Sequence, residues 1–177
     1  TIPAGSTTVV VPVSINPDSL VEADESFTFS LGVASGHSSI TVGAANVSTI
    51  SIIDDDSATV SVSNPTVTVA EGGSPAVFTL TQSAVSASDT VISYAFTPGT
   101  ASTADVSGIT ASVATISAGQ STAVVTIATN NDTIVEQSET FTVALSKVSG
   151  DASISLTTPT ATGTITDSDT ALLRIFA

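Results

Sequence analysis

Apolar and polar residues alternate along much of this chain with the period of a β-strand. In "ETFTVALS" (139–146), Phe141, Val143 and Leu145 fall on one face, and threonines occupy the other. The same alternation occurs in "ATVSVS" (58–63), "PAVFTLTQ" (75–82) and "DTVISYAF" (89–96). Because successive side chains of a strand point to opposite faces, the pattern predicts strands that each bury one face.

Turn-forming residues separate these segments, and no stretch has the spacing of an amphipathic helix. The turns are expected at Gly72-Gly73-Ser74-Pro75, Pro98-Gly99, Ala118-Gly119 and Gly150-Asp151. Several short strands at regular spacing without helices are typical of an antiparallel β-sandwich. We therefore expect an all-β fold.

The chain contains an internal repeat. Residues 1–36 align with residues 115–150 without a gap, and residues 54–58 then align with 167–171. The anchor pairs are Gly5/Gly119, Asp18/Asp132, Glu22/Glu136, Glu25/Glu139, Phe27/Phe141, Leu31/Leu145 and Gly36/Gly150. A repeat of about 113 residues has the size of one sandwich domain. This frame predicts three parts: the second half of one repeat (1–57), a complete repeat (58–170) and the first strand of another (171–177). We expect such a chain to be an interior piece of a tandem array.

Charge narrows the choice of partners. Two basic residues stand against 16 acidic ones, which gives a net charge of −14. Neutralising phosphates requires clustered Lys and Arg, so we expect no nucleic-acid partner and no attraction to an anionic membrane. No apolar run is long enough to insert into a bilayer. The abundance of Ser and Thr, with little Lys and no Cys, favours an extracellular or cell-surface location.

The acids of the complete repeat gather in a few places. Two runs, "DTIVEQSE" (132–139) and "DSD" (167–169), each flank the end of a predicted strand. Glu71 follows an early strand at the Gly-Gly break, and Asp105 lies in the loop after "TPGTASTA". Strand ends of a sandwich lie at one of two poles, so these loops can share a pole. The competing interpretation is a solvated acidic surface with no ligand.

Four motifs give the complete repeat a specific resemblance. "VAEGGSPAVFTL", "GTASTADV", "DTIVEQSETFTVALS" and "ATGTITDSD" occur in the order and spacing of the Calx-β family, the calcium-binding repeats of sodium/calcium exchangers, some integrin subunits and many bacterial surface proteins. The resemblance implies an immunoglobulin-like Greek-key sandwich of about seven strands in each repeat. It also implies a Ca²⁺ cluster at one pole. The implied ligands are Glu71, Asp105, Asp132, Glu136, Glu139, Asp167 and Asp169.

The chemistry of these residues agrees with the resemblance. Ca²⁺ takes six to eight oxygen ligands, so seven acids suit about two or three ions. Transition metals are disfavoured because Cys is absent and His37 is the one histidine. The truncated first repeat carries the matching acids Asp18, Glu22, Glu25, Asp54, Asp55 and Asp56. Its site would be whole only if ligands outside the chain supplied its missing half.

No nucleophile motif such as G-x-S-x-G is present, and a single histidine gives no general Ser-His-Asp triad. We therefore expect no catalytic activity. The expected role is a calcium-binding spacer or stalk of a large adhesin-like protein, in which Ca²⁺ stiffens the junctions between neighbouring repeats. The alternative is the subunit of a filament, in which another copy of the chain completes the half-repeat by strand complementation.

Overall fold

The computed structural model describes residues 1–33, 35–107 and 112–175, and in these ranges the regular secondary structure is entirely β. The chain divides into two compact units. The larger unit comprises Leu20–Ala23 and Asp55–Ala177, and the smaller one comprises Thr1–Ser19 and Asp24–Asp54.

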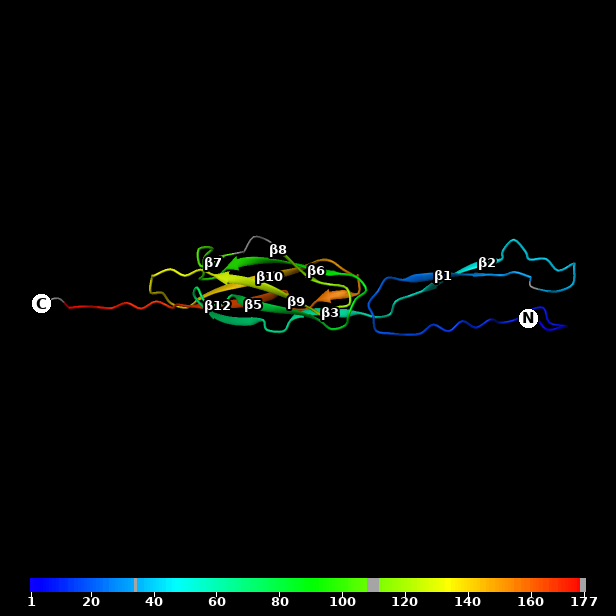
Figure 1. The fold of residues 1–177 in the computed structure, drawn as a ribbon, viewed down its shortest axis with the longest axis horizontal. Helices are drawn as coiled ribbons and strands as arrows, with labels where there is room; N and C mark the ends of the chain where they lie inside the picture. Colours follow the sequence, from blue (N-terminus) through cyan, green and yellow to red (C-terminus); the bar gives the residue numbers. More distant parts are fainter. Residues whose placement is uncertain (34, 108–111, 176–177) are drawn as a thin grey trace. The chain divides into compact units, whose positions relative to one another are not determined.

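The larger unit is a sandwich of two five-stranded sheets (Figure 1). One sheet has the order β4-β12-β10-β6-β8 and the other has the order β11-β3-β5-β9-β7. The strands are β3 (Ala58–Val62), β4 (Thr66–Ala70), β5 (Ala76–Gln82), β6 (Thr90–Pro98), β7 (Val106–Ser107), β8 (Ser112–Ile116), β9 (Thr122–Thr129), β10 (Glu139–Ser149), β11 (Ile154–Leu156) and β12 (Thr160–Thr166).

The predicted fold class is confirmed, with two refinements. Most neighbouring strands pair antiparallel, but β12 pairs parallel with β4, and β11 pairs parallel with β3. The described part of this unit has ten strands instead of about seven. One extra strand arises because the chain passes Pro65 between β3 and β4 and changes sheet there. The very short β7 and β11 account for the others.

The core lies between the two sheets and contains the side chains that the alternation predicted. Phe78 of β5 and Phe141 of β10 are buried, and their rings meet edge to face with centroids 6.4 Å apart. Gly163 of β12 lies opposite Phe141 in the strand register. A Cβ atom at Gly163 would overlap the Phe141 ring. The aromatic side chain therefore occupies the space that the glycine leaves.

The strand directions give the sandwich two distinct poles. Strands β4, β9 and β12 end at one pole, where β10 begins and the loop after β6 lies. We call it the acidic pole, after Glu71, Asp105, Asp132, Glu136, Glu139, Asp167 and Asp169 in its loops. The first strand, β3, begins at the opposite pole, which also holds the connection from β5 to β6. The chain therefore runs in at one pole and out at the other.

The smaller unit has little buried surface. Strands β1 (Glu25–Ser30) and β2 (Val47–Ile52) form an antiparallel pair in which Glu25 is opposite Ile52. Many apolar side chains of this unit are exposed, among them Val9, Val10, Val11, Val13, Ile15, Leu31, Val33 and Ile40. This matches the open core expected of a half-repeat, although the predicted boundaries at 57 and 170 stay predictions.

In the described part of the chain, no helix has the length and apolar character needed to cross a membrane.

Candidate metal site

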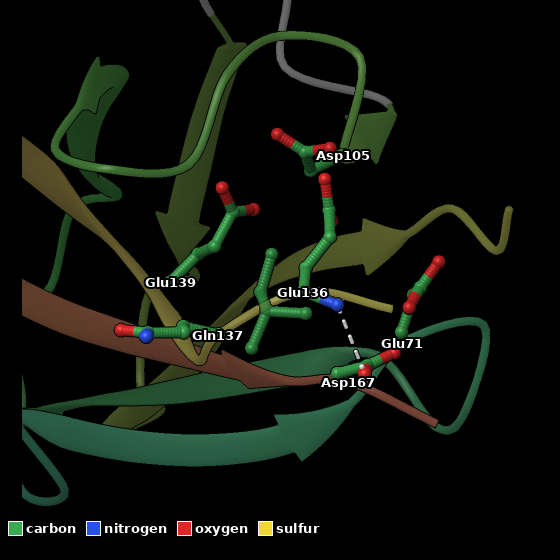
Figure 2. Close-up of a pocket in the computed structure, with 7 residues that line it drawn as sticks. Glu71, Asp105, Glu136, Gln137, Glu139 and Asp167 are labelled. Atoms are coloured by element: carbon green, nitrogen blue, oxygen red, sulfur yellow. Dashed lines mark hydrogen bonds between the residues drawn. The ribbon is translucent and has the colours of Figure 1, made fainter. Parts of the chain in front are cut away.

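Four loops bring the predicted acids of the complete repeat to the acidic pole. A hollow there is lined by Glu71, Asp105, Glu136, Gln137, Glu139, Ile165 and Asp167, and the acidic side chains converge on it (Figure 2). Glu71 follows β4, Asp105 precedes β7, the run 132–139 connects β9 to β10, and Asp167 follows β12. The resemblance implied these acids as ligands, and the sheet register explains why their loops lie at one pole.

The first group of acids consists of Glu71, Asp167 and Asp169. One carboxylate oxygen from each lies within 4.8 Å of the other two. The backbone N–H of Asp169 donates to Asp167 Oδ1 at 2.9 Å, which fixes the Asp167 carboxylate relative to the chain that follows β12. Asp169 Oδ2 is buried and has no hydrogen-bond partner among the described residues. A buried carboxylate oxygen without a partner is costly, so this atom calls for a ligand.

The second group consists of Asp105, Glu136 and Glu139, again with one oxygen from each within 4.8 Å of the others. Ser102 fixes the position of Asp105, because its backbone N–H donates to Asp105 Oδ2 at 2.6 Å. Glu139 is the first residue of β10, so the long central strand positions it.

Asp132 belongs to neither group but organises the loop between them. Its backbone N–H donates to Glu71 Oε1 at 2.5 Å, and its Oδ1 accepts from the Ile134 N–H at 2.7 Å. The Glu136 N–H donates to Asp167 Oδ2 at 3.1 Å (Figure 2). Two backbone bonds thus attach the loop 132–139 to the first group of acids.

The proximity of these acids changes their protonation. Desolvation and the charges of neighbouring carboxylates raise the pKa values of Glu136, Glu139 and Asp169. Desolvation also acts on Asp105, but hydrogen bonds from Ser102 and with Glu139 outweigh it and hold the pKa of Asp105 below its ordinary value. A raised carboxyl pKa means that the site resists carrying its full negative charge.

The donor set fits a hard divalent cation. The charged groups that converge on the hollow are all carboxylates, and Gln137 is a neutral residue of its lining. Hard oxygen ligands of this kind suit Ca²⁺. Lys147 is engaged elsewhere, since its ammonium donates to the Asp151 and Ile154 carbonyls near the far end of β10. Glu71, Asp167 and Asp169 would hold one ion, and Asp105, Glu136 and Glu139 would hold another.

The acids of the first repeat are distributed over both units. Asp18, Glu25 and Asp54 belong to the smaller unit, whereas Glu22, Asp55 and Asp56 belong to the larger one. In the smaller unit, Asp24 Oδ1 accepts the Asp54 N–H at 3.1 Å. Among the described residues, both acid groups close enough to share an ion come from the complete repeat.

Two contributors to the site were not predicted. Ser102 orients Asp105, and Gln137 lines the hollow. The spacing S-x-x-D in "STAD" (102–105) is a usable signal for the first, because an acidic side chain three residues after a Ser can accept the backbone N–H of that Ser, as in a capping box. Gln137 lies within the acidic run, where only the carboxylates had been singled out.

Comparisons with known proteins point to one family. The sequence model described as Calx-beta domain matches residues 2–56 and 54–169. A crystal structure of an apo-form Calx CBD1 domain has a TM-score of 0.56 and 21% identity, over 64% of this chain and 100% of that one. A structure of the calcium binding domain CBD12 of CALX1.1 has a TM-score of 0.52 and 20% identity, over 62% of this chain and 46% of that one. At such identities the structures support the fold. Comparison with curated proteins gave no significant match.

Proposed function

Because this chain belongs to the Calx-beta domain family, we propose that its complete repeat binds Ca²⁺ at the acidic pole as a non-catalytic structural module. The observation that carries this proposal is the pair of three-carboxylate groups, one of which contains Asp169 Oδ2, an atom with no hydrogen-bond partner in the described part of the chain. A bound cation supplies the positive charge that these carboxylates lack. The residues of the chain supply the rest by holding the oxygens in place.

We further propose that the chain is a spacer or stalk segment of a large extracellular or cell-surface protein, with an adhesin-like role. The internal repeat supports this role, as does the strand arrangement in which the complete repeat begins at one pole of the sandwich and ends at the other. Calcium at the acidic pole would remove the repulsion near the point where the chain leaves one repeat for the next, and it would thereby stiffen the junction.

A thermal melt of the full chain in Ca²⁺ and in chelator tests the metal proposal. An ion that binds only the folded state adds about 2.7 kcal/mol of stability at a concentration of 100 times its Kd. We expect a clearly higher melting temperature in Ca²⁺ and a smaller rise in Mg²⁺, which keeps its waters more strongly. Equal melting temperatures in Ca²⁺ and chelator would refute calcium binding.

A second candidate function is suggested by the exposed apolar residues of the smaller unit. A two-stranded sheet whose apolar side chains are uncovered has edges to which a strand from another copy could add. This arrangement would make the chain a filament subunit. Light scattering of the purified chain separates the two: a filament subunit gives concentration-dependent polymers, whereas a stalk segment stays at the mass of one chain.

A further inference from the structure

One residue from the first repeat's sequence is fully buried in the larger unit. Val21 is 0% exposed and lies beside the connection from β5 to β6. Its N–H donates to the Val85 carbonyl at 3.1 Å, and its own carbonyl accepts from the Ala87 N–H at 2.9 Å and from Ser86 Oγ at 3.0 Å. We call Val85, Ser86 and Ala87 the seat. Val21 adds to it in the manner of a strand residue.

The internal repeat identifies the equivalent of this buried residue. In the alignment that pairs Asp18 with Asp132, Leu20 corresponds to Ile134 and Val21 to Val135. In the larger unit these equivalents are uncovered: Ile134 is 59% exposed and Val135 is 51% exposed. The same position of the repeat is therefore buried in one copy and exposed in the other.

Val21 and Val135 lie at opposite poles of the sandwich, and this explains why one is buried and the other exposed. The seat lies at the pole opposite the acidic pole, close to Thr90 at the start of β6. The Gly119 N–H donates to the Ser86 carbonyl there at 2.8 Å. Ile134 and Val135 lie at the acidic pole, in the loop that precedes β10. A repeat that follows in the same chain would begin at the acidic pole and would present its own seat there.

The loop that carries Val135 is already held in shape. Asp132 Oδ1 accepts the Ile134 N–H, and Asp167 accepts the Glu136 N–H. The backbone of the two apolar residues is thus fixed from both sides, and their side chains are exposed. Two adjacent exposed aliphatic side chains on a constrained loop are suited to docking, because little conformational entropy is lost on binding.

We propose that Ile134 and Val135 are the docking element for the next repeat, in which Val135 occupies the seat as Val21 does in this one. The occupant is thus a following repeat of the same chain. The inference rests on the tandem arrangement of the proposed function, but not on calcium binding. It assigns the connection between repeats to a specific pair of surfaces.

A disulfide test suits this chain because it contains no Cys. The test protein is the full chain with a second copy of residues 58–170 inserted after Thr170, at the repeat boundary. It carries V135C in the original repeat and S86C in the inserted copy. The full chain with V21C and S86C serves as the positive control, because these two residues are bridge partners in the structure. The negative control carries V148C in place of V135C.

Val148 is a matched control because it is also exposed, at 62%, but lies near the far end of β10. After mild oxidation in Ca²⁺, we expect an intramolecular disulfide for the Val135 and Val21 pairs and background crosslinking for the Val148 pair. The proposal is overturned if the Val135 pair crosslinks no more than the Val148 pair while the Val21 pair forms. Crosslinks only between separate molecules would also overturn it, in favour of docking between chains.

Calcium binding is measured separately, by calorimetry on the native chain. Heat of binding without the Val135 crosslink would refute the docking surface alone. The crosslink without heat of binding would refute the calcium proposal alone.

Discussion

Asp169 combines one buried oxygen atom, charge repulsion and an unmade hydrogen bond in one half-buried carboxylate. Desolvation and the charges of Glu71, Asp167 and Asp132 raise its pKa, and its Oδ2 atom lacks a partner among the described residues. Without a cation, such a group opposes folding. With one, the same oxygen becomes a ligand. The carboxylate should therefore have opposite effects on the stability of the metal-free and the metal-bound protein.

The substitution Asp169→Asn tests this. Removing one charge at constant shape should weaken Ca²⁺ binding by about tenfold or more, and it should raise the melting temperature in chelator because repulsion falls. Calorimetry and thermal melts measure the two effects. Asp89→Asn is the control, since Asp89 lies outside the cluster and its Oδ1 accepts from the Ala118 N–H. A variant with unchanged affinity would exclude Asp169 as a ligand.

At the scale of residues, the acids of the acidic pole were named from the resemblance to the Calx-β family and its motifs. Their spacing left open whether the loops share a pole, and the strand directions of the structure bring those loops together. The hydrogen bond from Ser102 to Asp105 was not predicted, although "STAD" carries a signal for it, and the buried state of Asp169 Oδ2 has no signal in the sequence. Both depend on loop conformations that no periodicity encodes.

At the scale of strands, the packing of β10 against β12 depends on one glycine and one aromatic ring. Gly163 and Phe141 face each other across the pair, and the ring takes the volume of the absent side chain. The Phe141 ring also lies 5.4 Å from that of Phe96 and 6.4 Å from that of Phe78, measured between centroids. A side chain at 163 would therefore displace the centre of the core.

Gly163→Ala should destabilise the larger unit by about 1 to 3 kcal/mol, the usual cost of overfilling a packed core. Denaturant unfolding followed by circular dichroism measures the loss. Gly32→Ala is the control, because a Cβ atom at Gly32 meets nothing within 4 Å. A Gly163→Ala variant as stable as the parent would mean that the ring can move aside at no cost.

The strands themselves were well predicted by alternation, as in "ETFTVALS", which forms much of β10. The change of sheet between β3 and β4 was not predicted. Pro65 marks the break, but the choice of a new partner depends on pairing with β12, almost a hundred residues later in the chain. The sequence around Pro65 contains no signal for a partner strand so far away in the chain.

For the molecule as a whole, the concentration of acids predicts an unusual pH dependence. The raised pKa values of Glu136, Glu139 and Asp169 mean that the folded chain binds protons more tightly than the unfolded one. Their support for folding is complete below the ordinary values of 4.5 and 3.8 and is lost as the pH rises through the raised values. Asp105 acts in the opposite sense and supports folding above 3.8.

We therefore expect the calcium-free chain to melt at a lower temperature as the pH rises from about 4.5 to 7. The reason is that three carboxyl groups have raised pKa values and one has a lowered pKa. Saturating Ca²⁺ should abolish or reverse this trend, since the carboxylates are then neutralised. Melts across this pH range in calcium-free and calcium-containing buffers measure it. A calcium-free melting temperature that rises with pH would contradict the expectation.

The parallel pairing of β4 with β12 has a mechanical consequence. These strands belong to the beginning and the end of the complete repeat, and residues 66–70 are in register with 162–166. The chain enters this repeat at one pole and leaves it at the other, so a pull along the chain draws the two strands past each other. All the hydrogen bonds between residues 66–70 and 162–166 then bear the force together and do not break one after another. The pair of strands β4 and β12 would therefore be the part of the repeat that resists tension most strongly.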